Sequence, residues 1–229
     1  MKVYAIGDLH FSGGANKPMD VFGTHWTEHM ARIKENWEAI VQEEDYVLIP
    51  GDISWAMRLK DAEEDLACIE ALPGKKICIR GNHDYWWDRP GKLNKKYEKT
   101  YFLQNTAYPI GDICICGTRG WISPNMEWTE EDARLYAREL ERLKLSLEAA
   151  QDAKEIWVML HYPPTNHKDQ VSPLMELLKH YPVTKVIYGH LHDEISWETA
   201  LKGEICGIMY HLVAADYIRF EPVQIAEIE

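Results

Sequence analysis

The stretch Lys2-Val3-Tyr4-Ala5-Ile6-Gly7-Asp8-Leu9-His10 opens with an apolar, strand-like run and ends in two side chains that can bind a metal ion. Similar runs at 45–50, 75–80, 155–160 and 184–188 are each followed by further metal-binding residue types. These later segments are Gly51-Asp52, Gly81-Asn82-His83-Asp84, His161 and Gly189-His190-Leu191-His192. Because the carboxyl ends of parallel strands meet at one edge of a sheet, we expect all five segments to gather there.

Helical patterns lie between most of these runs. Helices are predicted over 61–72, from Thr129 onward and over 171–181. A further helix is predicted near the start of the chain, because apolar residues recur there at helical spacing: Trp26, Met30, Ile33, Trp37, Ile40 and Val41. Another strand-like run covers 112–117, and 205–225 is interpreted as short strands that return to the sheet as a meander. The alternation predicts an α/β fold with helices outside the sheet, and the length favours a single domain over residues 1–229.

The charge of the chain narrows the class of partner. The 229 residues include 37 carboxylates and 25 Lys and Arg, which gives a formal net charge of -12. Because such a negative surface repels a phosphate backbone, we expect no long nucleic acid as partner. A small phosphorylated molecule held by metal ions remains compatible with this charge.

Cysteine usage and the first residues favour a cytoplasmic location. The five cysteines are odd in number and form no C-x-x-C motif, and Cys114 and Cys116 alternate on a strand-like run as packed thiols do. The first residues lack the apolar core and cleavage site of a signal peptide, and no stretch is long enough to span a bilayer. We therefore expect no membrane association.

Asp, Asn and His supply oxygen and imidazole donors, which suit hard or borderline cations. Asp8 and His10 are two residues apart after a strand and can reach the same cation. Each residue alone has an ordinary alternative: a turn or helix-cap role for Asp8, and a satisfied buried histidine for His161. The order of the five segments favours a metal site over these alternatives.

The same ordered segments, from residue 7 to residue 192, resemble the calcineurin-like metallophosphoesterases. The resemblance implies a four-layer α-β-β-α sandwich. It also implies a binuclear metal-dependent phosphoesterase, in which a metal-bridging hydroxide attacks a phosphomonoester or phosphodiester. The choice between a phosphomonoester and a phosphodiester as substrate stays open at this point, as does the oligomeric state.

The resemblance also implies a role for each motif residue. Asp8, His10, Asp52 and His192 would bind one ion, and Asp52, Asn82, His161 and His190 the other, with Asp52 as the bridge. The cofactors would be two divalent or trivalent ions (Mn, Fe, Zn, Co or Mg), with Mn expected to support activity best. His83 would protonate the leaving group, and Asp84 would orient the His83 imidazole and raise its pKa. The alternative for His83 is another metal ligand.

Candidate substrate contacts are Arg119 on the phosphate and Trp55 against an aromatic group, with a solvated Arg and a packed Trp as the ordinary alternatives. Trp86 and Trp87 are further candidates for the wall of the cleft, and residues 11–23 are predicted to form a mobile loop. Where the protein phosphatases carry an Asp-Arg pair, this chain has Ile53-Ser54-Trp55-Ala56, which argues against a close match to them.

Two rival functions on the same fold are a non-catalytic metal-binding scaffold and a nuclease. A scaffold tends to lose ligands or the catalytic His, and this chain keeps them all. A nuclease would need a basic groove or an added binding domain, which the charge of -12 disfavours. Lipid-precursor pyrophosphatases of the family carry Arg at the position of His83. The enzyme is therefore the favoured hypothesis.

Overall fold

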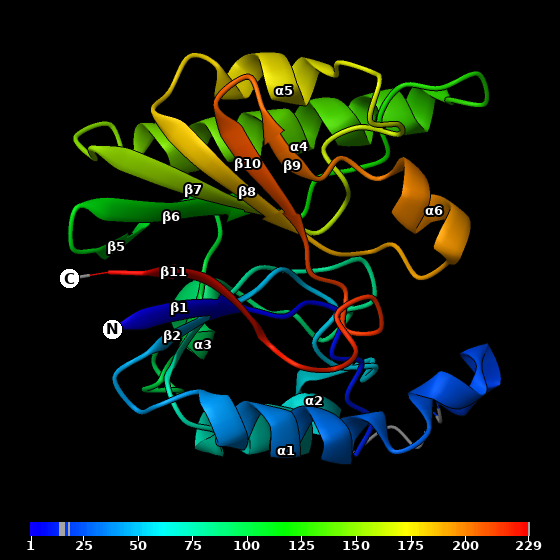
Figure 1. Ribbon diagram of the computed structural model, residues 1–229, viewed down its shortest axis with the longest axis vertical. Helices are drawn as coiled ribbons and strands as arrows, with labels where there is room; N and C mark the ends of the chain where they lie inside the picture. Colours follow the sequence, from blue (N-terminus) through cyan, green and yellow to red (C-terminus); the bar gives the residue numbers. More distant parts are fainter. Residues whose placement is uncertain (14–16, 18, 229) are drawn as a thin grey trace.

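Two β-sheets packed face to face form the centre of the computed structural model, which describes residues 1–13, 17 and 19–228 (Figure 1). The first sheet has, in spatial order, β11 (Val223–Glu227), β1 (Lys2–Ala5), β2 (Tyr46–Ile49), β3 (Lys75–Cys78) and β4 (Thr100–Phe102). Strands β1 to β4 run parallel, and β11 is antiparallel to β1. The carboxyl ends of β1, β2 and β3 therefore share one edge.

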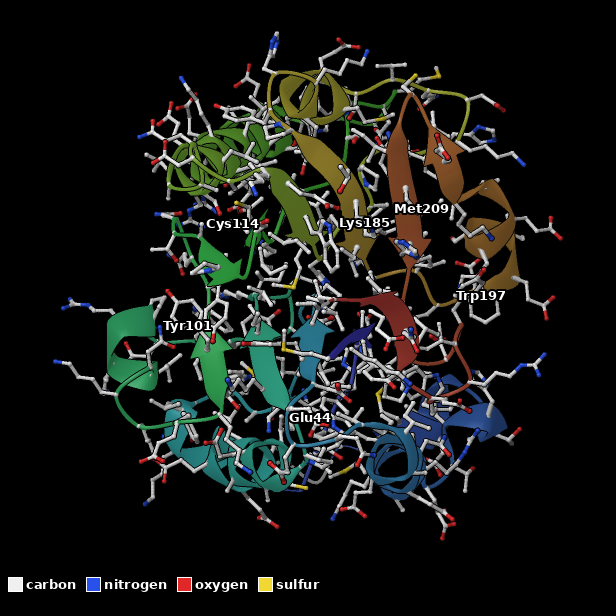
Figure 2. The ribbon with its side chains drawn as sticks, turned by 60° about the vertical axis from the view of Figure 1, so that its left-hand side comes forward. Glu44, Tyr101, Cys114, Lys185, Trp197 and Met209 are labelled. Atoms are coloured by element: carbon white, nitrogen blue, oxygen red, sulfur yellow. The ribbon has the colours of Figure 1, made fainter. Side chains whose placement is uncertain are left out.

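The second sheet has the order β5 (Tyr108–Ile110), β6 (Ile113–Thr118), β7 (Glu155–Leu160), β8 (Val183–Tyr188), β10 (Ile208–Leu212) and β9 (Gly203–Ile205). Its four central strands are parallel, and the two outer strands pair with them in the antiparallel sense. In Figure 2, Lys185 and Met209 mark β8 and β10 of this sheet, and Tyr101 marks β4 of the sheet below it.

Helices cover the outer face of each sheet, which completes the predicted four layers (Figure 1). The helices α1 (His29–Ile40) and α2 (Leu59–Ala71) lie against the first sheet, and α4 (Glu130–Glu148) and α5 (Pro173–Leu178) against the second. The shorter elements are α3 (Pro90–Leu93), α6 (Glu194–Thr199) and the 3-10 helices η1 (Met19–Phe22) and η2 (Thr24–Trp26). None of the helices in the described part of the chain is long and apolar enough to cross a membrane.

Three hydrophobic cores separate the four layers, because alternate side chains of a strand point to opposite faces. Trp157 and Met159 of β7 point into the core between the sheets, whereas Ile156 and Val158 pack against the helices of the second sheet. Cys114 and Cys116 both belong to this helix-side core, as their alternation predicted. Both sheets are therefore buried on both faces, as parallel sheets usually are.

The predicted strands over the first 188 residues are confirmed, and the differences lie in short elements. Trp26 belongs to η2, because α1 begins only at His29 after Glu28 adopts a left-handed conformation. The C-terminal strands are not one meander: β9 and β10 join the second sheet, while β11 pairs with β1 of the first. Of the predicted loop over 11–23, residues 14–16 and 18 lie outside the described residues, and η1 is helical.

Candidate metal centre

Asp8, His10 and His192 come together from opposite sheets and offer donor atoms within 4.8 Å of one another. Asp8 and His10 follow β1, and His192 follows β8. Oδ1 of Asp8 lies 3.6 Å from Nε2 of His192, and the second carboxylate oxygen accepts the backbone N–H of His190 at 2.9 Å. These are three of the four side chains that were expected to bind the first ion.

The predicted second set meets around Nε2 of His161, which follows β7. This nitrogen lies 2.5 Å from Oδ1 of Asn82, 3.1 Å from Nδ1 of His190 and 3.4 Å from Oδ2 of Asp52. On the far side of the ring, Nδ1 of His161 lies 3.1 Å from the carbonyl oxygen of Pro50, which fixes the imidazole. Four donors from four strand ends thus point at one small volume.

Asp52 lies between the two sets. Its Oδ2 is 3.7 Å from Nε2 of His10 and 3.4 Å from Nε2 of His161, a position that suits a bridging ligand. Asp8 belongs to both groups as well, because its Oδ1 is 3.8 Å from Nδ1 of His161. The sequence predicted only one carboxylate between the sites, and the structure brings two there.

The electrostatics of the cluster fit a bound cation. Burial, Asp84 and Asp8 together raise the pKa of Asp52 well above its usual value. Burial would lower the pKa of His192, but Asp216 and Asp8 outweigh it and raise that pKa to about 10, which shows how strongly the carboxylates here favour positive charge. Oδ1 of Asp8 is buried and has no hydrogen-bond partner among the described residues. A cation would supply that partner and offset the repulsion between carboxylates.

Burial also prepares two histidines as neutral ligands. It lowers the pKa of His161 to about 3 and that of His190 to about 4. Because a metal ion binds the neutral imidazole, neither ring needs to lose a proton at neutral pH before it binds.

The backbone at this edge is strained where the ligands are presented. Positive φ angles occur at Asp8 (56°), Asp52 (52°) and His190 (74°), a region that residues other than glycine rarely adopt. Gly81 and Gly189 are required for a different reason, since a Cβ at either would overlap the carboxylate of Asp52 or Asp8. Such strain persists only where the surrounding structure enforces it, and it is typical of functional sites.

The Asp84 carboxylate holds the backbone of two ligand loops. Its Oδ2 accepts the N–H of Gly81 at 2.7 Å and of Asp52 at 2.9 Å, and its Oδ1 accepts those of Ile53 and Ser54 and the indole N–H of Trp86. None of its hydrogen bonds among the described residues reaches the His83 ring. The expected role for Asp84 in orienting that ring is therefore corrected: Asp84 positions the loops instead.

His83 belongs to neither group of converging donor atoms and faces a cavity of about 290 Å³ beside them. Its backbone N–H donates to Oδ1 of Asp52 at 2.8 Å, which fixes the residue next to the centre. Burial lowers its pKa, contrary to the rise expected from Asp84. An imidazole at the edge of this cavity, free of carboxylate partners among the described residues, is placed to exchange a proton with a bound molecule.

Aromatic and apolar side chains form the wall of this cavity. Trp55 stacks on His10 with ring centroids 4.7 Å apart and lies 4.3 Å from His83. Phe22 of η1 lies nearly parallel to Trp55 at 6.3 Å, and Met19 and Trp26 complete the wall. Trp55 thus lines the cavity beside the metal centre, and its contact with a substrate stays a prediction.

The other candidates lie elsewhere. Trp86 is buried in the core beneath the site, and the indole N–H of Trp87 donates to Gln104. Arg119 does not line the cavity of the metal centre but a second cavity, next to Glu139. This position does not support its expected contact with a phosphate at the metals.

Three residues around the centre were missed in the sequence. Oδ1 of Asp216 lies 3.0 Å from Nδ1 of His192, Nε2 of His29 lies 3.1 Å from the carbonyl oxygen of His10, and the Tyr162 ring lies 4.2 Å from that of His190. Tyr162 directly follows His161, which was a usable signal. Asp216 comes soon after a strand, but no motif surrounds it.

Comparisons with known proteins bear on the family and on the fold. The family model described as calcineurin-like phosphoesterase matches residues 1–194. No curated protein matches the chain. Among solved structures, the phosphopantetheinyl hydrolase of Mycobacterium tuberculosis is 13% identical with a TM-score of 0.58, covering 99% of this chain and 96% of that one. A protein of unknown function from Aquifex aeolicus is 15% identical with a TM-score of 0.49, covering 97% and 95%.

Proposed function

The chain belongs to the calcineurin-like phosphoesterase family, and from that premise we propose that it is a two-metal hydrolase of a small phosphoester. The observation that carries the proposal is the meeting of Asp8, His10, Asp52, Asn82, His161, His190 and His192 from five strand ends of two sheets. Two bound cations would activate water for attack on phosphorus and neutralise charge on the phosphoryl oxygens.

The protein's own side chains would hold the cations, position the ligand loops and supply a proton. Asp8 and Asp52 would hold the cations from between the two ligand sets, and Asp84 would keep the loops of Asp52 and Asn82 in register through its backbone hydrogen bonds. Asp216 would fix the His192 ring, as carboxylates behind metal-bound histidines commonly do. His83 would donate a proton to the leaving oxygen from the cavity side.

The wall of the cavity supports a substrate class. Phe22, Trp55, Met19 and Trp26 present apolar and aromatic surface next to His83, where the leaving alcohol would lie. Such a wall favours an alcohol with an aromatic or apolar portion, because burying it removes apolar area from water. The net charge of -12 disfavours long nucleic acid in the same place.

Removal and return of metal tests the proposal. Protein stripped by a chelator should lose hydrolysis of an aryl phosphate and of an aryl phosphodiester, and Mn²⁺ should restore at least one of the two. Comparing the two substrates assigns the monoester or diester preference. If the protein takes up metal but cleaves neither ester with Mn, Fe, Zn, Co or Mg, the enzyme proposal fails and the scaffold alternative stands.

A further inference from the structure

A second cavity, of about 120 Å³, lies beside the metal centre and shares no lining residue with the first. It opens where β3 and β6 end and is covered by the middle of α4. One water needs roughly 10–15 Å³ of such space, so the cavity has room for a group of several atoms. Its polar lining is dominated by four arginines: Arg80, Arg119, Arg138 and Arg142.

This concentration of positive charge is unusual for so acidic a chain. The protein has nine arginines and a net charge of -12, yet four of the nine line one small cavity. The only acidic residue in the lining is Glu139, which is buried. The cavity therefore carries a formal charge of about +3, since arginine stays protonated in proteins.

Glu139 alone does not account for the four guanidinium groups. Its Oε2 accepts the hydroxyl of Thr118 at 2.6 Å, and its Oε1 accepts Nη1 of Arg142 at 2.8 Å, so a single carboxylate with two oxygens faces several guanidinium groups. Arg119 and Arg138 lie farther away, with nitrogens 3.7 and 3.5 Å from Oε1. Arg80 has no carboxylate partner among the described residues, and its Nε donates to the carbonyl oxygen of Asp84.

Donors remain unused in this cavity. Nε of Arg119 is buried without a hydrogen-bond partner among the described residues. The carbonyl oxygen of Gln104 is taken by the indole N–H of Trp87, which leaves the NH₂ of that amide as a donor. Burial lowers the pKa of Arg119, Glu139 opposes this, and Arg80 and Arg138 lower it further. An anion would supply acceptors for the donors and relieve the repulsion.

We propose that the arginine cavity binds a phosphoryl group, at a site separate from the metal centre. Planar guanidinium groups pair with phosphate oxygens through two parallel hydrogen bonds, which suits several arginines around one tetrahedral anion. The cavity adjoins the centre, because the carbonyl oxygen of Arg119 accepts the N–H of His161 and Arg80 precedes Asn82 by two residues. The phosphoryl group can come from two sources. One is a second phosphoryl group of the substrate, and this source rests on the proposed function; the other is free phosphate.

Equilibrium dialysis of the metal-loaded protein with radiolabelled inorganic phosphate tests the site. Arg138→Gln/Arg142→Gln should weaken the binding of one phosphate equivalent by about tenfold or more, since the double variant loses two positive charges and their hydrogen bonds to the anion. Arg134→Gln is the matched control, because Arg134 lies on the same helix but pairs with Glu131 outside the cavity, and it should bind as the wild type does. If the double variant does not fold, Arg138→Gln alone serves, since that side chain is 49% exposed.

Unchanged phosphate affinity and stoichiometry in the folded variant would overturn the proposal. Kinetics then identify the occupant. If the variant has a higher KM for an aryl bisphosphate and an unchanged KM for p-nitrophenyl phosphate, the site binds the substrate. If added phosphate changes the turnover of p-nitrophenyl phosphate by the wild type but not by the variant, the site binds free phosphate. Because dialysis needs no turnover, a protein without hydrolase activity would refute the proposed function while leaving the phosphate site tested.

Discussion

Oδ1 of Asp216 lies 3.0 Å from Nδ1 of His192, while Nε2 of the same ring faces Asp8 across 3.6 Å. The imidazole is thus held between a carboxylate on its outer side and the proposed cation position on its inner side. A hydrogen bond on the outer nitrogen fixes the tautomer that leaves Nε2 free to bind a metal ion. Asp216 therefore belongs to the surroundings of the metal centre, although no sequence motif contains it.

Asp216→Ala should weaken Mn²⁺ binding by about 10- to 100-fold, the usual effect of losing a carboxylate behind a metal-bound histidine. Competition with a fluorescent chelator measures the dissociation constant directly. Asp112→Ala, at an exposed residue that pairs with Lys154, is the control and should bind Mn²⁺ as the wild type does. Wild-type affinity in the Asp216 variant would show that His192 is held without it.

Asp84→Asn should lower the free energy of unfolding by about 3 kcal/mol, because an amide cannot replace a carboxylate that accepts five hydrogen bonds. Urea unfolding of the two proteins measures the difference. Asp88→Asn, on the same loop with an exposed ion pair to Lys92, should change stability by no more than about 0.5 kcal/mol. A loss as small for Asp84 as for Asp88 would contradict its role in holding the ligand loops.

His83→Ala should retain both metal ions and lose a factor on the order of 10²–10⁴ in kcat on alkyl phosphates. The loss on p-nitrophenyl phosphate should be much smaller, since p-nitrophenolate departs without a proton. The same steady-state assay on both esters, with metal analysis, separates proton donor from ligand. Equal losses on the two esters, or loss of a metal equivalent, would contradict the assignment.

The pH dependence of alkyl ester hydrolysis follows from the same assignment. A proton donor works only in its protonated form, so kcat should fall as pH rises through the pKa of His83. Burial lowers that pKa, so the fall should begin at a lower pH than an exposed histidine would give. His83→Ala should lack this descending limb, and its persistence in the variant would assign the limb to another group.

Phe22→Ala should raise KM for an aryl phosphate by about two- to tenfold, because an aromatic contact contributes about 0.5–1.5 kcal/mol. Phe22 is 63% exposed, so the change should leave folding intact. Val21→Ala is the control, at a neighbour that is 73% exposed but does not line the cavity. Equal KM values for Phe22→Ala and the wild type would remove the ring from the substrate site.

The convergence of the candidate ligands could be predicted, because each follows an apolar strand and parallel strands deliver their ends to one edge. Asp216 and the role of Asp84 could not, because they depend on which backbone and ring atoms come within reach once two sheets pack. Arg138 and Arg142 are spaced as neighbours on one helix face, but their partners Arg80 and Arg119 come from separate strand ends. Local sequence patterns do not show which side chains from separate elements will line the same cavity.

Stepwise addition of Mn²⁺ to metal-free protein, with the initial rate of aryl ester hydrolysis recorded at each step, tests the two-metal centre most directly. At a protein concentration far above the dissociation constants, the rate should rise until two equivalents per chain are present and then stay constant. A rate that levels off at one equivalent, or no hydrolysis at any ratio, would contradict a binuclear phosphoesterase.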